Sequence, residues 1–524
     1  MRLPLRHTDV RVRPAVALAV MCLSIFIAGI DITVVNVALP SLARDLHADN
    51  AELQWIVDAY SLTSAGFLLS AGNLGDRYGR RGLLCWGLVL FAAMSALSAT
   101  AGSPAVLIAA RAAMGLGAAS IFPTTLALIT NIFRDPGQRA KAIGVWSAMG
   151  GLGVVVGPIA GGWLVQHVSV GSIFWINVPI AAVAIAGTLT SVPTSRDPAP
   201  PPLDVTGLVT SSLGVATLTY TIIEAPNVGW SSARTFGGFV AAALLLAGFI
   251  WRERHTAQPM LRPSMFADRR FSGGCLAVSA AYLALFGFVF VMAQYLQFIT
   301  GYSPFQAGAR LLPVAFSIAA ASIFAPRIDE RLGTTSAVVV GLLSFAAAMG
   351  WSATFQADTP YWAIGSAMAL FGGGLGLTVA CATDSIMGSL DVAAAGVGSA
   401  VASASRQLAG SLGVAIVGSA FASVYATSLE TNPALSQLDP GRRGTMRQSM
   451  AAADQVIAQL PAGQAGSVRH AVEAAFLDGL WVGCLVCAAV AVIAAAAVAA
   501  VLPRRASSPE EPIARQHVSP TPDG

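Results

Sequence analysis

Long apolar runs recur along almost the whole chain, and each one is long enough to cross a lipid bilayer as a helix. A spanning helix needs about 20 mainly apolar residues. Only 11% of the residues are charged, whereas soluble domains carry about 25%. The sequence therefore predicts an all-α integral membrane protein with fourteen transmembrane helices. The runs lie near residues 15–39, 52–71, 83–101, 105–129, 140–165, 172–191, 205–224, 235–251, 274–298, 305–325, 335–354, 361–383, 396–424 and 478–502.

The basic residues predict how these helices are oriented. Most of the 30 Lys and Arg residues fall in alternate connections, which the positive-inside rule assigns to the cytoplasm. Both termini are then expected to be cytoplasmic. The basic N-terminus, residues 1–14, precedes an apolar run that is too long for a signal peptide, so we expect this run to remain as the first helix.

Two related turns divide the chain into halves. DRYG at 76–79 follows the second predicted helix, and the similar ERLG at 330–333 follows the tenth. Internal repeats of this kind are typical of secondary transporters. The repeat predicts two six-helix bundles with a linker and two inserted helices between them, followed by a disordered cytoplasmic tail that is rich in proline and mixed charges. The predicted domains are the bundles 15–191 and 274–502, the linker 192–273 with inserted helices near 205–224 and 235–251, and the tail 503–524.

The two turns are also predicted to form a conformational latch on the cytoplasmic side. Glycines allow a tight turn, and the charged side chains can bind helix termini and opposite charges when the bundles approach each other. The simpler alternative is that the arginines only fix the topology, but this does not explain the repeated spacing. The predicted latch residues are Gly72, Gly75, Asp76, Arg77, Gly79, Arg80, Arg81, Glu330, Arg331 and Gly333.

Sequence motifs in the first half resemble those of a known transporter family. GNLGDRYGRRG (72–82) resembles the signature loop of the major facilitator superfamily, and fourteen helices resemble its drug:proton antiporter branch. GPIAGG, within the fifth predicted helix, resembles the antiporter motif of that branch, which implies export. Glycines four residues apart also favour ordinary close packing of helices, which is the plainer alternative. The motif residues are Gly153, Gly157, Pro158, Gly161 and Gly162.

Three ionisable residues are expected at a similar depth in the first bundle. Asp31, Asp58 and Arg111 lie about 9–12 Å from the outer ends of their predicted helices. A lipid-facing charge there costs at least about 2.5 kcal/mol, so these side chains should face the protein interior. We expect the aspartates to carry or govern a proton and Arg111 to tune them; the alternative is a static ion pair. The resemblance supports the first interpretation, because each position matches a family motif.

Six further residues are candidates for the wall of a mostly apolar substrate cavity. A structural role is the stronger alternative for the arginine in the thirteenth helix. Neither a P-loop nor a helix-borne metal motif is found in the sequence, so we expect no metal, no cofactor apart from the coupling proton, and no enzymatic activity. The candidates are Phe122, Tyr282, Phe286, Tyr295, Arg310 and Arg406.

The connection 425–477 is too long for a simple loop. Met446, Met450, Ala453 and Ile457 recur at helical spacing within it. They predict an amphipathic helix on the outer surface.

The resulting hypothesis is a proton-coupled antiporter that exports drugs, antibiotics or related organic compounds by alternating access. It would act in the cytoplasmic membrane of a bacterium with a GC-rich genome. Its substrate would be amphipathic or lipophilic, and membrane lipid would be its other partner. The net charge of +4 is too small to suggest that the protein binds nucleic acid. We expect a monomer. The alternatives are a proton-driven uptake symporter of the same fold, and a lipid-handling protein or non-transporting membrane sensor.

Overall fold

The computed structural model describes residues 13–195, 204–256, 263–389, 395–436 and 438–502, and its regular structure there is entirely helical. Nearly all of the predicted N-terminal segment 1–14, residues 196–203 of the linker and the predicted tail 503–524 lie outside the described residues.

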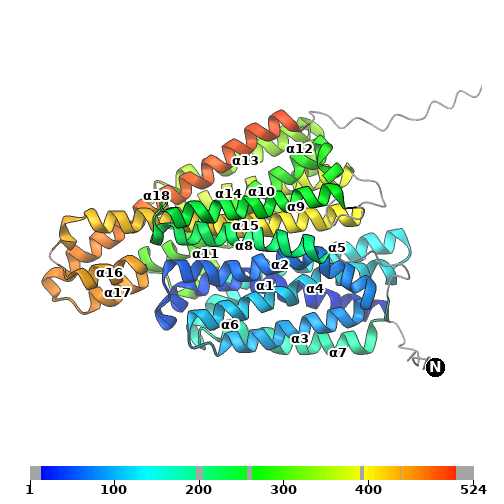
Figure 1. Cartoon of the computed structure of the whole chain (residues 1–524), viewed down its shortest axis with the longest axis horizontal. Coiled ribbons are helices and arrows are strands. Elements are labelled where there is room, and N and C mark those ends of the chain that lie inside the picture. Colours follow the sequence, from blue (N-terminus) through cyan, green and yellow to red (C-terminus); the bar gives the residue numbers. More distant parts are fainter. Residues whose placement is uncertain (1–12, 196–203, 257–262, 390–394, 437, 503–524) are drawn as a thin grey trace, which may run out of the picture.

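The first bundle is built from α1 to α7 (Figure 1). Serine or aspartate residues cap several of these helices at their N-termini. Asp49, for example, accepts a hydrogen bond from the Glu52 amide at 2.8 Å, and the Glu52 side chain accepts one from the Asp49 amide in return. The helices are α1 Pro14–Leu46, α2 Asn50–Tyr78, α3 Arg80–Ala99, α4 Pro104–Ile132, α5 Pro136–His167, α6 Ser172–Trp175 and α7 Asn177–Ser191.

The two inserted helices are α8 (Val205–Val228) and α9 (Ala233–His255). Helix α8 packs against α2 of the first bundle and against α15 of the second, so it lies where the two bundles meet (Figure 1). Asp204 caps α8 and accepts a hydrogen bond from Arg252 of α9 at 2.9 Å. Burial raises the pKa of Asp204, but the hydrogen bonds from Arg252 and from the backbone outweigh burial and hold the pKa below its usual value.

The second bundle contains α10 to α18. It includes a short π-helix, Tyr295–Ile299, which continues α10, and a helical hairpin, α16 and α17, which extends beyond the bundle. The helices are α10 Arg269–Gln294, α11 Pro304–Arg310, α12 Leu312–Leu332, α13 Thr334–Ser352, α14 Tyr361–Gly388, α15 Ala395–Thr431, α16 Pro440–Gln448, α17 Met450–Ala458 and α18 Ala462–Val501.

The described residues include thirteen candidate membrane spans, each long and apolar enough to cross a bilayer. The fourteenth predicted helix, α2, exists as a continuous helix of 29 residues but is not among these candidates. Helix α2 contains polar residues, including the buried Gln54 and Asp58, which lower its hydropathy. It can carry them because it packs against α4, α8 and α15 rather than facing only lipid. All fourteen predicted segments are therefore helical in the structure.

The long outer connection differs from the single surface helix that the sequence predicts. It folds into two helices, because Ser449 adopts an extended conformation and caps α17 through the Ala452 amide. Met446 and Ile457 are buried rather than exposed to headgroups. The last helix also begins at Ala462, well before the predicted position near 478, and its extra turns pack against α17.

The contacts described between the bundles lie at the end of the molecule opposite the arginine-rich turns. We call this end the outer end. Gln297, in the π-helix after α10, donates a hydrogen bond to the Val37 carbonyl of α1 at 2.9 Å. Ser419 of α15 donates to the Gln54 side chain of α2 at 3.3 Å. One large apolar core, with residues from both bundles, surrounds these contacts.

Candidate functional site

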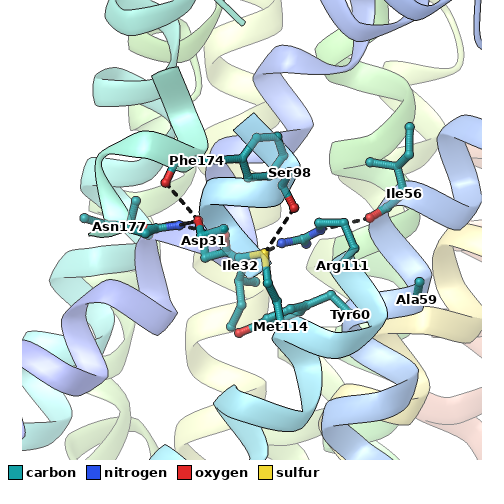
Figure 2. Close-up of polar contacts among 12 residues, drawn as sticks. Asp31, Ile32, Ile56, Ala59, Tyr60, Ser98, Arg111, Met114, Phe174 and Asn177 are labelled. Atoms are coloured by element: carbon teal, nitrogen blue, oxygen red, sulfur yellow. Dashed lines mark hydrogen bonds and ion pairs between the residues drawn. The ribbon is translucent and has the colours of Figure 1, made fainter. Parts of the chain in front are cut away.

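Asp31 and Arg111 form an ion pair in the interior of the first bundle. Asp31 is 0% exposed and Arg111 is 1% exposed, and their Oδ2 and Nη1 atoms are 2.5 Å apart. The two residues come from α1 and α4, as Figure 2 shows. Helix α1 packs closely on α5 at this level, because Gly29, two residues before Asp31, lies directly against the α5 backbone. The structure thus brings together two of the three predicted ionisable residues.

The second oxygen of Asp31 is also occupied. Asn177, at the start of α7, donates to Asp31 Oδ1 at 3.2 Å and lies 3.0 Å from the Ser95 hydroxyl. Ser95 in turn donates to the Phe174 carbonyl at 2.8 Å. Asn177 was not among the predicted site residues; its only signal in the sequence is an amide side chain at the beginning of an apolar helix.

Arg111 is held on three sides. Its Nε donates to the Ile56 carbonyl of α2 at 3.1 Å, and its guanidinium carbon lies 4.5 Å from the centre of the Tyr60 ring (Figure 2). A guanidinium over an aromatic face is an attractive arrangement. With Asp31 as its counterion, Arg111 therefore ties α1, α2 and α4 together.

Asp58 does not join this pair. It lies between Ile56 and Tyr60 in sequence, but a helix turns by about 200° over two residues, so it points away from the face that contacts Arg111. Asp58 is 0% exposed, and neither carboxylate oxygen has a hydrogen-bond partner among the described residues. The Ser411 hydroxyl of α15 is near this carboxyl group but makes no hydrogen bond with it in this structure.

The two aspartates therefore have different surroundings, although the sequence predicts similar depths. Asp31 has a cation and an amide donor, whereas Asp58 is buried without either. Burying an unpaired carboxylate costs several kcal/mol or more. Protonation would remove that cost at Asp58 but would break an existing ion pair at Asp31.

The motif glycines of α5 are packing positions, and they contact two different neighbours. A Cβ atom on Gly157 would come within 2.2 Å of the Thr33 hydroxyl of α1. Gly153 and Gly161 approach α1 in the same way. Gly162 instead faces the second bundle, where a Cβ atom would lie 2.4 Å from the Pro304 carbonyl oxygen.

Pro158 takes part in the same contact between the bundles. A Cβ atom on Gly308 of α11 would come within 2.1 Å of the Pro158 carbonyl oxygen. The motif therefore places backbone against backbone at the outer end, where α5 and α11 meet. Side chains on Gly162 or Gly308 would force the two bundles apart at this end.

The two repeated turns have the same backbone design. Gly79 joins α2 to α3 with φ 108°, and Gly333 joins α12 to α13 with φ 80°. Both conformations lie in a region that strongly favours glycine. A single glycine thus reverses the chain at matching points of the two bundles.

In this structure the first turn contacts its own bundle. Arg81 donates to the Leu189 carbonyl at 2.5 Å, and the Arg80 amide donates to the Ser195 carbonyl at 2.9 Å. Arg77 is exposed beside Tyr78. In the second turn Glu330 and Arg331 are exposed. The side chain of Asp76 lies outside the described part of the chain, and Gly75 packs beside Thr124 in the first bundle.

Four of the six predicted cavity residues are half-buried and fall into two clusters. In the first bundle the Phe122 and Trp146 rings meet edge to face at 5.6 Å. In the second, Tyr282 stacks with Phe286 at 6.2 Å, and the Arg406 guanidinium lies 5.9 Å from the Tyr282 ring. In both clusters the predicted residues are partly exposed, whereas Trp146 itself is buried.

The other two predicted cavity residues lie elsewhere. Tyr295 is 0% exposed, packs against Phe355 and donates to the Gln356 carbonyl at 2.7 Å, so it belongs to the core of the second bundle. Arg310 lies at the end of α11, between the rings of Tyr302 and Tyr361 at 3.7 and 5.1 Å. The sequence showed that both residues lie in apolar segments but not which way they face.

Comparison with known proteins agrees with this architecture. A family model described as Major Facilitator Superfamily matches residues 21–414. Over 496 residues the chain is 34% identical to the multidrug efflux pump LfrA of Mycolicibacterium smegmatis, which covers 94% of this chain and 97% of that protein. It is 33% identical over 497 residues to the tetracenomycin C resistance and export protein of Streptomyces glaucescens, covering 93% and 92%.

A solved structure shows the same fold. The crystal structure of a bacterial homolog of the human lysosomal transporter Spinster superposes with a TM-score of 0.63 and 16% sequence identity, covering 94% of this chain and 98% of that one. The predicted family and fold are confirmed. The chain is a multi-pass membrane transporter rather than an enzyme, and it belongs to the major facilitator superfamily.

Proposed function

We propose that this protein exports amphipathic organic compounds, including drugs and antibiotics, in exchange for protons across the cytoplasmic membrane of a bacterium. The observation that supports coupling to protons is the environment of the Asp58 carboxyl group. This group is fully buried between the bundles and has no partner among the described residues. Such a carboxyl group favours burial when it carries a proton and contact with water when it is charged.

This difference gives a simple cycle. With Asp58 protonated, α2 and α15 pack closely and the outer end stays closed, as in the structure. Loss of the proton to the cytoplasm leaves a charge that needs water, and the outer ends of the bundles separate to supply it. A new proton from outside then returns the molecule to the closed arrangement. Asp31 and Arg111 keep α1, α2 and α4 together as one moving body.

The substrate would bind between the two aromatic clusters, Phe122 with Trp146 and Tyr282 with Phe286, on the partly exposed sides of Phe122, Tyr282 and Phe286. Aromatic faces suit flat, lipophilic compounds, and Arg406 beside Tyr282 adds one polar contact. The names of the two relatives compared above, a multidrug efflux pump and a tetracenomycin C resistance and export protein, support this substrate class and the outward direction.

Accumulation of a fluorescent dye in intact cells tests the proposal. We expect bacteria that lack their own drug exporters to retain less ethidium when they produce this protein, and to lose the effect with Asp58→Asn. Asp45→Asn is the matched control, because Asp45 is an exposed aspartate at the end of α1. Equal dye retention with and without the protein, over a panel of cationic, neutral and anionic compounds, would favour a non-transporting role.

A further inference from the structure

Several buried polar groups without hydrogen-bond partners gather where α2, α8 and α15 meet. Among the described residues, no partner is found for the Gln54 Nε2, Thr219 Oγ1 and Ser411 Oγ atoms, or for the two oxygens of Asp58. Each of these four residues is at most 1% exposed. We call this set, Gln54, Asp58, Thr219 and Ser411, the polar junction. One of its members, Thr219, lies on an inserted helix.

The register of the helices places these residues near one another. Helices α2 and α8 run antiparallel, because Gly66 of α2 lies against Ser212 of α8, whereas Gln54 lies near Ile222. The second proximity follows from Ser419 of α15, whose hydroxyl is 2.8 Å from the Ile222 carbonyl and 3.3 Å from Gln54 Oε1.

Asp58 and Thr219 therefore lie at the same level. Asp58 is one turn below Gln54 on α2, and Thr219 is one turn below Ile222 on α8. Thr219 also shares the face of α8 on which Ile222 packs against α2 and α15. Ser411 is near the Asp58 carboxyl group from the third helix. Helices α2, α8 and α15 thus direct polar side chains into the same buried region.

Buried polar groups in folded proteins almost always have a partner, and ordered water is the usual one when no protein group serves. A buried water molecule typically makes about three hydrogen bonds. The polar junction offers a hydroxyl from α8, a hydroxyl from α15, and a carboxyl and an amide from α2. On its outer side, the Ser419 hydroxyl of α15 lies between the Gln54 side chain of α2 and the Ile222 carbonyl of α8, and so joins the three helices.

We propose that the polar junction is a water-binding proton site and that inserted helix α8 completes it through Thr219. The proposal deepens the proposed function, because it rests on Asp58 as the proton carrier. It assigns α8 a positioning role: the Thr219 hydroxyl holds the water that passes the proton to and from Asp58.

The test compares two buried threonines of α8. Thr219→Val removes the hydroxyl at the polar junction. Thr221→Val removes a hydroxyl that donates to the Thr217 carbonyl of its own helix at 2.8 Å and faces Gly238 of α9. Thr219→Ser restores the hydroxyl and controls for misfolding. The first measurement is the infrared carbonyl band of protonated Asp58 in purified protein, assigned by its loss in Asp58→Asn.

We expect Thr219→Val to move this band to higher wavenumber, because the carboxyl group loses a hydrogen bond, and to slow substrate-induced proton flux in liposomes about fivefold. Thr219→Ser and Thr221→Val should resemble the unmodified protein. An identical band and flux in Thr219→Val and Thr221→Val would overturn the proposal. If instead Asp58→Asn keeps full pH-dependent export, the proposed function fails, while the infrared comparison still decides whether Thr219 contacts Asp58.

Discussion

Asp31 and Arg111 are each satisfied by the other, so either one becomes a buried, unpaired group when its partner is removed. Breaking a buried ion pair in this way costs about 3–5 kcal/mol. We therefore expect Asp31→Asn and Arg111→Gln each to lower the free energy of unfolding by that amount. The double variant should lose less than the two single losses added together. Chemical unfolding of the detergent-solubilised protein measures all three values.

Asp45→Asn is the control for these variants, since Asp45 lies on the same helix as Asp31 but is exposed. It should unfold like the unmodified protein. Strictly additive losses in the double variant would mean that the two residues do not stabilise each other.

The sequence predicted part of this site. The depths of Asp31 and Arg111 in their helices were enough to predict that they could meet. The separation of Asp58 depends on which face of α2 meets α4, and neighbouring helices decide that. Asn177 could not be anticipated, because its role depends on α7 lying beside α1 and α3.

Helix α5 closes the outer end through glycine contacts that leave no room for a side chain. Gly162→Ala would place a methyl group 2.4 Å from the Pro304 carbonyl oxygen. Such overpacking destabilises the closed arrangement by about 1–3 kcal/mol. Separation of the bundles would relieve it, so the outer-open population should rise roughly tenfold. Distances between spin labels on Asp45 and Thr431, exposed at the outer ends of α1 and α15, would report this change.

Gly144→Ala on the same helix provides the comparison, because a Cβ atom there has no neighbour within 4 Å among the described residues. It should leave the distance distribution unchanged. A Gly162→Ala distribution that coincides with that of Gly144→Ala would show that α5 and α11 do not control closure.

The repeated turns make a second prediction about elements. Gly79→Ala and Gly333→Ala each force alanine into a backbone conformation that disfavours side chains, at a cost of about 1–3 kcal/mol. Gly82→Ala, at the third residue of α3, should instead be neutral or stabilising, because a Cβ atom there has no neighbour within 4 Å in the described part of the chain. Thermal unfolding of the three variants distinguishes these outcomes, and similar losses for Gly82 and Gly79 would contradict the backbone explanation.

The sequence predicted the membrane helices more accurately than it predicted the outer hairpin. The length of the apolar runs alone predicted the positions of the spans. In the lipid interior every backbone polar group needs a partner within the protein, so a long apolar segment there is almost always a helix. In the hairpin, the apolar pattern correctly indicated helical structure, but Met446 and Ile457 lie on two separate helices rather than on the single helix predicted. The break at Ser449 and the burial of that face depend on contacts with α15 and α18, which no local pattern encodes.

At the scale of the whole molecule, we expect docking of the outer hairpin, α16 and α17, to depend on pH. Asp454 of α17 lies 3.5 Å from Arg469 of α18. Burial raises the pKa of Asp454, and this effect outweighs attraction to Arg469 and Arg44, while Glu473 raises the pKa further. The docked hairpin therefore binds a proton more readily than the undocked one. Docking should strengthen as the pH falls through this raised pKa and weaken toward neutral pH.

Hydrogen exchange at the α17 amides measures this dependence. After correction for intrinsic exchange rates, we expect greater protection in mildly acidic buffer than at neutral pH. Asp454→Asn should remove most of the difference, because the amide does not titrate. A pH dependence that persists unchanged in this variant would assign it to Glu473 or another group.

Everted membrane vesicles with an acidic lumen test most directly whether the protein couples outward drug movement to inward proton movement. In these vesicles the cytoplasmic face is outside, so an exporter should concentrate ethidium in the lumen while the lumen loses protons. Asp58→Asn should abolish both signals, and Asp45→Asn neither. Dye accumulation without proton movement, or an undiminished signal in Asp58→Asn, would contradict the account.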